Sequence, residues 1–105
     1  MTGAELIALE RQRQIEEEGW TIEGDVQKHS EYDLAFAAMC YACPYPKDKS
    51  GPVVFFKSKT CPAMWPWDAK WWKPSPENRV RELVKAGALI AAEIDRLQSL
   101  EKNND

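Results

Sequence analysis

The last third of the chain carries a helical pattern that is longer than one small domain can cover. Apolar and small residues recur at helical spacing in the run "ENRVRELVKAGALIAAEIDRLQSLEK". Ser75 suits the N-cap and Pro76 the first turn, so the predicted helix covers 76–101 and spans roughly 40 Å. We expect a second copy to cover part of this helix, and we predict a homo-oligomer. One face of the helix carries Val80, Leu83, Val84, Gly87, Ile90, Ala91, Ile94 and Leu97.

Two shorter helices precede it. Thr2 and Glu5 have the T-x-x-E spacing of a capping box, which predicts a helix over 3–18 that stops at Gly19. Ser30 and Asp33 form a second capping pair, ahead of a helix over 31–43 that is apolar nearly all round. The predicted fold is mostly α: one domain over 1–105, built as a small three-helix bundle.

Residues 44–74 interrupt the helical pattern. They hold six of the seven prolines and four of the five tryptophans of the chain. The stretch "PVVFFKS" is the best strand candidate, so this crossover is expected to contain a short β-hairpin. A segment of ~30 residues without a helix is long for a compact domain, and such segments are usually functional or ordered by their own packing.

Composition excludes several function classes. The net charge of −3 argues against duplex DNA as a partner, because binding to the DNA backbone needs a basic face. No apolar run approaches the ~18 residues that span a membrane, and the N-terminus lacks a signal-peptide pattern. We therefore expect a cytoplasmic protein. Three cysteines and one histidine would suffice for a zinc site, but Cys40 and Cys43 lie on a predicted helix, and we predict no bound metal or other cofactor.

The tryptophan block "WPWDAKWWKP" at 65–74 has two interpretations. Each indole buries up to about 250 Å², so the block could complete the core of a small domain. Exposed indoles beside cations would instead stack on a flat, anionic ligand, with further help from the amides at the start of the last helix. On the second interpretation the ligand-binding residues from this region are Trp67, Lys70, Trp71, Trp72, Lys73 and Arg79.

His29 and Asp25 complete the predicted ligand-binding set. An Asp–His pair could act as a general base, but the chain offers no obvious nucleophile, so no catalytic residue is assigned. Lys85 lies in an apolar turn of the last helix, where we expect it to extend its ammonium group to solvent, with contact to one of the tryptophan rings as the second possibility.

Three stretches of the chain, "ERQRQIEEEGW", "WPWDAKWWKP" and "RELVKAGALIAAEIDRL", resemble a family of small proteins from tailed bacteriophages and prophages. This resemblance implies a viral accessory protein. A looser one is to the all-helical MazG-type nucleotide pyrophosphohydrolases, which hold magnesium with an E-E-x-x-E and an E-x-x-D on successive helices. This chain departs from that pattern. Glu16–Glu18 are consecutive and diverge around the helix, and Glu82 and Glu93 are three turns apart.

Three functions are consistent with these patterns. The first is a phage accessory protein that binds a nucleotide-like small molecule in the host cytoplasm, and that would sequester a host immune signal without cleaving it. The second is a MazG-like, magnesium-dependent (d)NTP pyrophosphohydrolase that would depend on Glu17 and Glu93. The third is a protein–protein inhibitor that blocks a host enzyme with exposed tryptophans. We rank them in this order.

Overall fold

A computed structural model describes residues 1–19, 32–43, 61, 64–75 and 77–103 of the chain. Its described elements are the helices α1 (Gly3–Glu18), α3 (Asp33–Ala42) and α4 (Arg79–Asn103), with a short 3₁₀ turn, η2 (Ala69–Trp71), before α4. The mostly α fold class is therefore confirmed. The predicted strand at 52–58 lies outside the described residues. None of the described helices is both long and apolar enough to cross a membrane.

Helix α1 has the ends that its sequence predicts. The Thr2 hydroxyl accepts a hydrogen bond from the Glu5 amide, and the Glu5 carboxylate accepts one from the Thr2 amide, which completes the capping box. Gly19 ends the helix in the left-handed conformation, with φ of 70°, where a side chain would be strained. Both predicted boundaries of this helix are confirmed.

Helix α4 begins three residues later than predicted. Asn78, not Ser75, is the cap: its side-chain oxygen accepts a hydrogen bond from the Arg81 amide at 3.1 Å. Ser75 instead belongs to the turn ahead of the helix. Its carbonyl oxygen accepts from the Asn78 amide, and its own amide donates to the Glu82 carboxylate at 3.3 Å. Both residues are good capping types, so sequence alone does not separate them.

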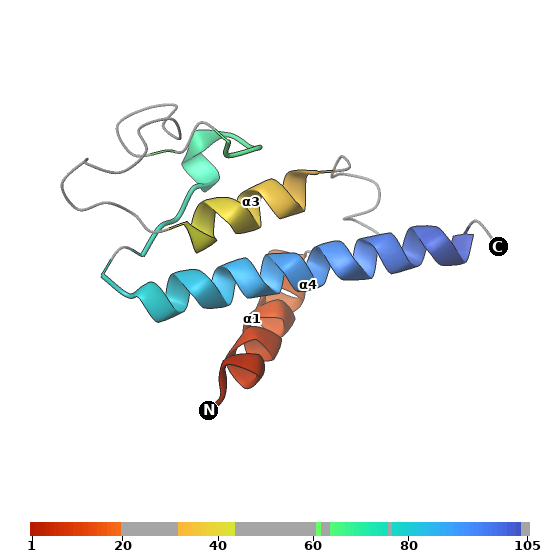
Figure 1. Cartoon of the computed structure of the whole chain (residues 1–105), viewed down its shortest axis with the longest axis horizontal. Helices are drawn as coiled ribbons and strands as arrows, with labels where there is room; N and C mark the ends of the chain where they lie inside the picture. The colour runs from red at the N-terminus through yellow and green to blue at the C-terminus, as the bar shows by residue number, and fades with distance from the viewer. Residues whose placement is uncertain (20–31, 44–60, 62–63, 76, 104–105) are drawn as a thin grey trace.

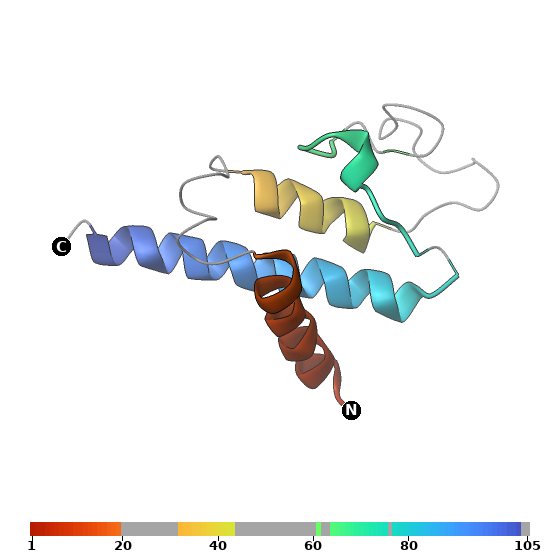
Figure 2. The same ribbon diagram turned by 180° about the vertical axis from the view of Figure 1, so that it is seen from behind.

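Helix α4 is the centre of the fold. Helix α3 lies alongside its N-terminal half, and α1 crosses it steeply, as both views show (Figures 1 and 2). Helices α1 and α3 each pack on α4, and these are the two helix pairs in contact among the described residues. Since α1 and α3 do not contact each other in this part of the chain, each covers a separate face of α4.

The crossing point of α1 is set by Gly87. A Cβ atom at this position would collide with the side chain of Ile7, so the glycine lets Ile7 pack directly against the backbone of α4. On the other side of α4, small residues keep α3 close: Ala37 and Ala88 are fully buried, and Leu34 and Leu89 are 1% exposed. The core thus forms where α3 and the tryptophan block meet α4.

Candidate functional site

The tryptophan block is folded by Asp68. Its carboxylate accepts a hydrogen bond from the Lys70 amide at 3.0 Å, and its carbonyl oxygen accepts from the Trp71 amide, which forms the turn η2. The same carbonyl accepts from the indole Nε1 of Trp65 at 3.1 Å. One aspartate therefore fixes the indole of Trp65 and the backbone of the turn that carries Trp71.

Two of the tryptophans are core residues. Trp65 is 2% exposed and Trp72 is 7% exposed, and both contact the ring of Tyr41 from α3. The Tyr41 and Trp72 rings have centroids 4.7 Å apart, and the Trp65 and Trp72 rings 5.0 Å apart. This geometry is the edge-to-face and tilted packing that aromatic rings prefer. Trp72, assigned above to the ligand, thus belongs to the floor beneath the site.

The other two tryptophans remain accessible. Trp67 is partly buried and lies edge-on to Trp65, with ring centroids 5.2 Å apart. Trp71 is 60% exposed, and the Lys70 ammonium lies 5.3 Å from the centroid of its ring. The block is therefore divided: Trp65 and Trp72 complete the core, Trp67 packs against it with part of its ring uncovered, and Trp71 faces solvent.

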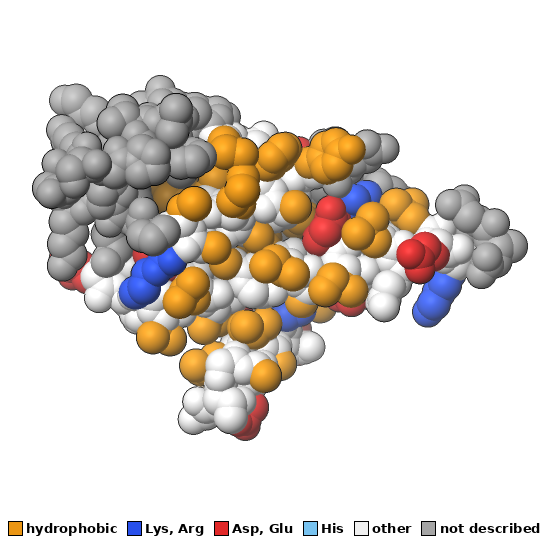
Figure 3. Space-filling view, in the orientation of Figure 1, with side chains coloured by type: hydrophobic (Ala, Val, Ile, Leu, Met, Phe, Trp, Pro, Cys, Tyr) orange, Lys and Arg blue, Asp and Glu red, His pale blue; other side chains and the backbone are white. Residues whose placement is uncertain are grey.

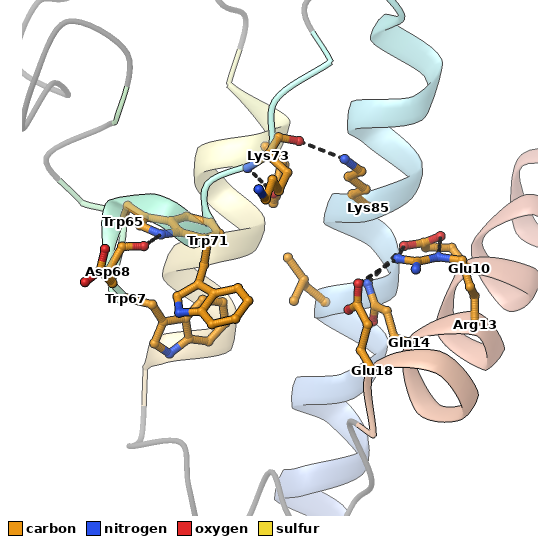
Figure 4. Close-up of a pocket in the computed structure, with 12 residues that line it drawn as sticks. Glu10, Arg13, Gln14, Glu18, Trp65, Trp67, Asp68, Trp71, Lys73 and Lys85 are labelled. Atoms are coloured by element: carbon orange, nitrogen blue, oxygen red, sulfur yellow. Dashed lines mark hydrogen bonds and ion pairs between the residues drawn. The ribbon is translucent and has the colours of Figure 1, made fainter.

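A cleft of about 670 Å³ opens between these indoles and helix α1. Figure 4 shows Trp65, Trp67 and Trp71 on one side of it, and the polar side chains of α1 on the other. The volume lies in the usual range for small-molecule sites, about 300–1,000 Å³. The cleft is lined by Glu10, Arg13, Gln14, Glu18, Tyr41, Trp65, Trp67, Asp68, Trp71, Lys73, Lys85 and Leu89.

The α1 wall is built around a buried carboxylate. The Glu10 side chain is 2% exposed and lies 2.8 Å from both Arg13 Nη2 and Arg81 Nη1. Burial alone would raise the pKa of Glu10, but hydrogen bonds from Arg13 and Arg81 outweigh it and hold this pKa below its ordinary value. The amide nitrogen of Gln14 donates to the same carboxylate at 3.3 Å. The wall is thus a fixed network with little net charge.

Lys85 joins this wall to the aromatic floor. Its Nζ donates to the Lys73 carbonyl oxygen at 2.8 Å and lies 5.4 Å from the centroid of the Tyr41 ring. Burial lowers the pKa of Lys85, and the neighbouring Arg81 lowers it further. The Tyr41 hydroxyl accepts from the Lys73 amide at 3.2 Å, and burial raises the pKa of Tyr41 to about 12. The aromatic ring under Lys85 is thus that of Tyr41, and not one of the tryptophans that the sequence suggested.

Three of the predicted binding residues come together in the cleft: Trp67, Trp71 and Lys73. Lys70 lies outside it, over the Trp71 ring. Arg79 is held elsewhere, since its guanidinium donates to the carbonyl oxygens of Tyr41 and Cys43 at the end of α3 and pairs with Glu82. His29 and Asp25 lie outside the described residues.

Sequence reasoning missed the α1 half of the cleft. Arg13 and Gln14 lie three and four residues after Glu10, and Glu18 lies four after Gln14, so all four share one helix face. Such charged spacing is typical of a solvated helix surface, so it does not by itself indicate a binding site. Tyr41 was missed because its helix is apolar nearly all round.

The carboxylates and cysteines of the metal interpretations are placed differently. Glu17 and Glu18 pair with Arg13, and Glu93 lies 2.6 Å from Arg96. Cys61 is buried, whereas Cys43 is exposed at the end of α3. Within the part of the chain that the structure describes, no three His, Cys, Asp or Glu side chains lie close enough to hold a metal ion.

The resemblances to phage proteins and to MazG-type enzymes stay predictions. A comparison of the chain with protein-family models, with curated proteins and with solved structures finds no match in any of the three.

Proposed function

We propose that this protein binds a nucleotide-like small molecule in the cleft between α1 and the tryptophan block. The planar base would lie against the accessible indoles of Trp67 and Trp71. Its phosphate would lie near Lys73, which is exposed at the cleft. Such stacking contributes roughly 1–3 kcal/mol per base.

The observation that carries this proposal is the exposure of Trp71. The indole of Trp71 is 60% exposed beside a cleft of about 670 Å³. Exposure of a large apolar surface to water is unfavourable in free energy, and a ligand that covered the ring would remove this penalty. Its neighbour Trp65 is buried, so the block has enough packing contacts to hide a tryptophan where the fold requires it. The exposure of Trp71 therefore favours a binding role for this residue.

The charges around the cleft limit how much negative charge a ligand can carry. Three acidic and three basic side chains line it, and Glu10 and Arg13 are already paired with each other. Lys85 is engaged with the Lys73 carbonyl and the Tyr41 ring, which leaves Lys73 as the lining cation best placed for phosphate. A nucleoside monophosphate or a cyclic nucleotide fits this balance better than a triphosphate. Glu18 and Asp68 offer acceptors to the N–H groups of a base.

Isothermal titration calorimetry tests the proposal. We expect heat from at least one member of a panel of nucleoside monophosphates, cyclic nucleotides and ADP-ribose-type nucleotides, and weaker binding of nucleoside triphosphates. Trp71→Ala should weaken the binding by about 5- to 150-fold, which corresponds to the loss of one stacked base.

Tyr32→Ala is the matched control, because Tyr32 is an aromatic residue at the N-cap of α3 that is 63% exposed and does not line the cleft. It should leave the affinity unchanged. The absence of heat with every nucleotide would contradict the proposal, and so would an equal loss of affinity in Trp71→Ala and Tyr32→Ala.

A further inference from the structure

Within the described residues, the side-chain amide oxygen of Gln14, in the α1 wall of the cleft, has no hydrogen-bond partner. Gln14 is 3% exposed, and its amide nitrogen donates to the Glu10 carboxylate at 3.3 Å. This contact fixes the orientation of the amide, because the reversed amide would place two oxygens against each other. Buried polar groups in proteins normally have a hydrogen-bond partner, so this oxygen favours a ligand group that donates to it.

Glu18 adds a second acceptor beside Gln14. It lies one helical turn further along α1, and Figure 4 shows the two side chains next to each other at the cleft. Oε1 of Glu18 accepts from Arg13 Nη2 at 3.2 Å, whereas the other carboxylate oxygen has no hydrogen-bond partner among the described residues. The two side chains therefore offer neighbouring acceptor oxygens to a ligand.

The donors of the same wall are already engaged. Arg13 donates from Nε and Nη2 to the Glu10 carboxylate, and from Nη1 to Glu17. Its Nη2 also donates to Glu18, and the amide nitrogen of Gln14 is held by Glu10. A wall that presents acceptors favours a base whose facing edge carries adjacent N–H donors.

We propose that the nucleotide bound in the cleft carries guanine. Guanine has two adjacent donors on its Watson–Crick edge, the N1–H and the 2-amino group. Adenine and cytosine have a ring-nitrogen acceptor beside their amino group, and the N3–H of uracil lies between two carbonyls, so each of them would turn an acceptor toward the acceptors of α1.

In this arrangement the Glu18 carboxylate accepts the N1–H and the Gln14 amide oxygen accepts from the 2-amino group. The Glu18 side chain is 40% exposed, so it turns as the base enters and lets the 2-amino group reach the buried oxygen. The exposed indole of Trp71 stacks on the ring. This inference rests on the nucleotide binding proposed above and adds the identity of the base.

Selection of a base requires polar groups, which another large surface of the molecule offers sparsely. The face of α3 and α4 turned to the viewer in Figure 3 is mostly apolar. Leu83, Ile90 and Ile94 of α4 are about half exposed, and such side chains give a base apolar contact without a hydrogen bond. The polar wall of α1 is therefore the better place to distinguish one base from another.

Calorimetry with GMP, IMP and AMP tests the proposal on the full chain. IMP keeps the N1–H but lacks the 2-amino group, so it should bind about 2- to 10-fold more weakly than GMP, which corresponds to one hydrogen bond. AMP has an acceptor in place of the N1–H and no 2-amino group. It should bind about 10- to 150-fold more weakly than GMP, because it loses the hydrogen bond to a charged carboxylate.

Two substitutions assign the contacts to their residues. Gln14→Met should reduce the ratio of GMP to IMP affinity to about one and leave the affinity for IMP unchanged, whereas a purely structural role would weaken both nucleotides equally. Glu18→Gln should reduce the preference for GMP over AMP, because an amide can also donate to the ring nitrogen of adenine. Glu17→Gln is the matched control: Glu17 also pairs with Arg13, but it is 68% exposed and does not line the cleft, so the preference should persist.

The outcomes separate this inference from the proposal on which it rests. The absence of heat with every nucleotide would remove the binding site and the guanine assignment together. Binding of AMP as tight as that of GMP would leave the binding site in place and overturn the guanine assignment alone. An unchanged ratio of GMP to IMP affinity in Gln14→Met would overturn the role of Gln14. The wild-type comparison needs no substitution, so it decides the identity of the base even if Gln14→Met fails to fold.

Discussion

The guanidinium of Arg79 lies 3.0 Å from the backbone carbonyl oxygen of Tyr41, and this contact ties the first residue of α4 to the end of α3. The same guanidinium donates to the carbonyls of Ala42 and Cys43. It therefore caps the C-terminus of α3, where carbonyl groups lack helical partners. Because Tyr41 also packs on Trp65 and Trp72, this cap positions the floor of the cleft.

Arg79→Ala should destabilise the fold. The substitution removes the cap of α3 and leaves the buried carboxylate of Glu82 without its arginine. We expect the free energy of unfolding to fall by about 1.5–3 kcal/mol, the usual range for hydrogen bonds to a charged group. Urea denaturation followed by circular dichroism measures it. Lys70→Ala removes an exposed cation from the same region and should change the stability by less than about 0.5 kcal/mol.

The two classes of tryptophan should separate in a stability measurement. Trp65→Ala removes a buried indole that contacts Tyr41, Trp67 and Trp72, so it should cost about 3–5 kcal/mol. Trp71→Ala should change the stability by less than about 0.5 kcal/mol, because this indole is mostly exposed. Chemical denaturation compares the two variants. A similar loss in both would contradict the division of the block into core and surface.

The sequence predicted the helices but could not predict which indole is buried and which is exposed. Local signals predicted the helices well: the capping box at Thr2 and the glycine at position 19 act within one turn of the chain. The orientation of each indole depends instead on the turn that Asp68 caps and on Tyr41, which lies 24 residues before Trp65. Burial that arises from distant contacts cannot be inferred from local spacing.

The charged residues illustrate the same limit. Glu10 and Arg81 are far apart in the chain and form an ion pair at 2.8 Å only because α1 crosses α4. Arg79 was predicted to bind a ligand because it follows the tryptophan block, yet the end of α3 takes up its donors. The role of a lysine or arginine that is close to a candidate site in sequence therefore depends on which acceptors its N–H groups reach in the fold.

The ion pairs of Glu10 should make the stability depend on pH. The pKa of Glu10 is lower in the fold than in the unfolded chain, so the unfolded state takes up protons first as the pH falls. The stabilisation is therefore complete above the ordinary glutamate pKa of about 4.3 and is lost as the pH falls through the folded-state value.

Glu10→Gln isolates this contribution. At neutral pH the variant should be less stable than the wild type by about 1–3 kcal/mol, since Arg13 and Arg81 lose a charged partner. The difference should shrink as the pH falls below the ordinary glutamate pKa and through the lower folded-state value, which urea titrations at a series of pH values would reveal. Glu77→Gln, at an exposed position, serves as the control and should show no such convergence. A constant difference across the pH range would show that the Glu10 carboxylate does not act through its charge.

The close approach of α1 and α4 at Gly87 predicts a coupling between two substitutions. Gly87→Leu should cost about 1–3 kcal/mol, because the new side chain must displace Ile7 from its position over the glycine. Ile7→Ala creates space at the same point, so the penalty of Gly87→Leu should be smaller in that background. The coupling free energy from the four chains should be about 0.5–3 kcal/mol, as for residues in direct contact. Gly3→Leu is the control, because nothing lies within 4 Å of a Cβ at Gly3, and it should not couple to Ile7→Ala. Additive penalties at positions 7 and 87 would contradict the direct contact between Ile7 and Gly87. This contact is what places α1, and with it the α1 wall of the cleft, against α4.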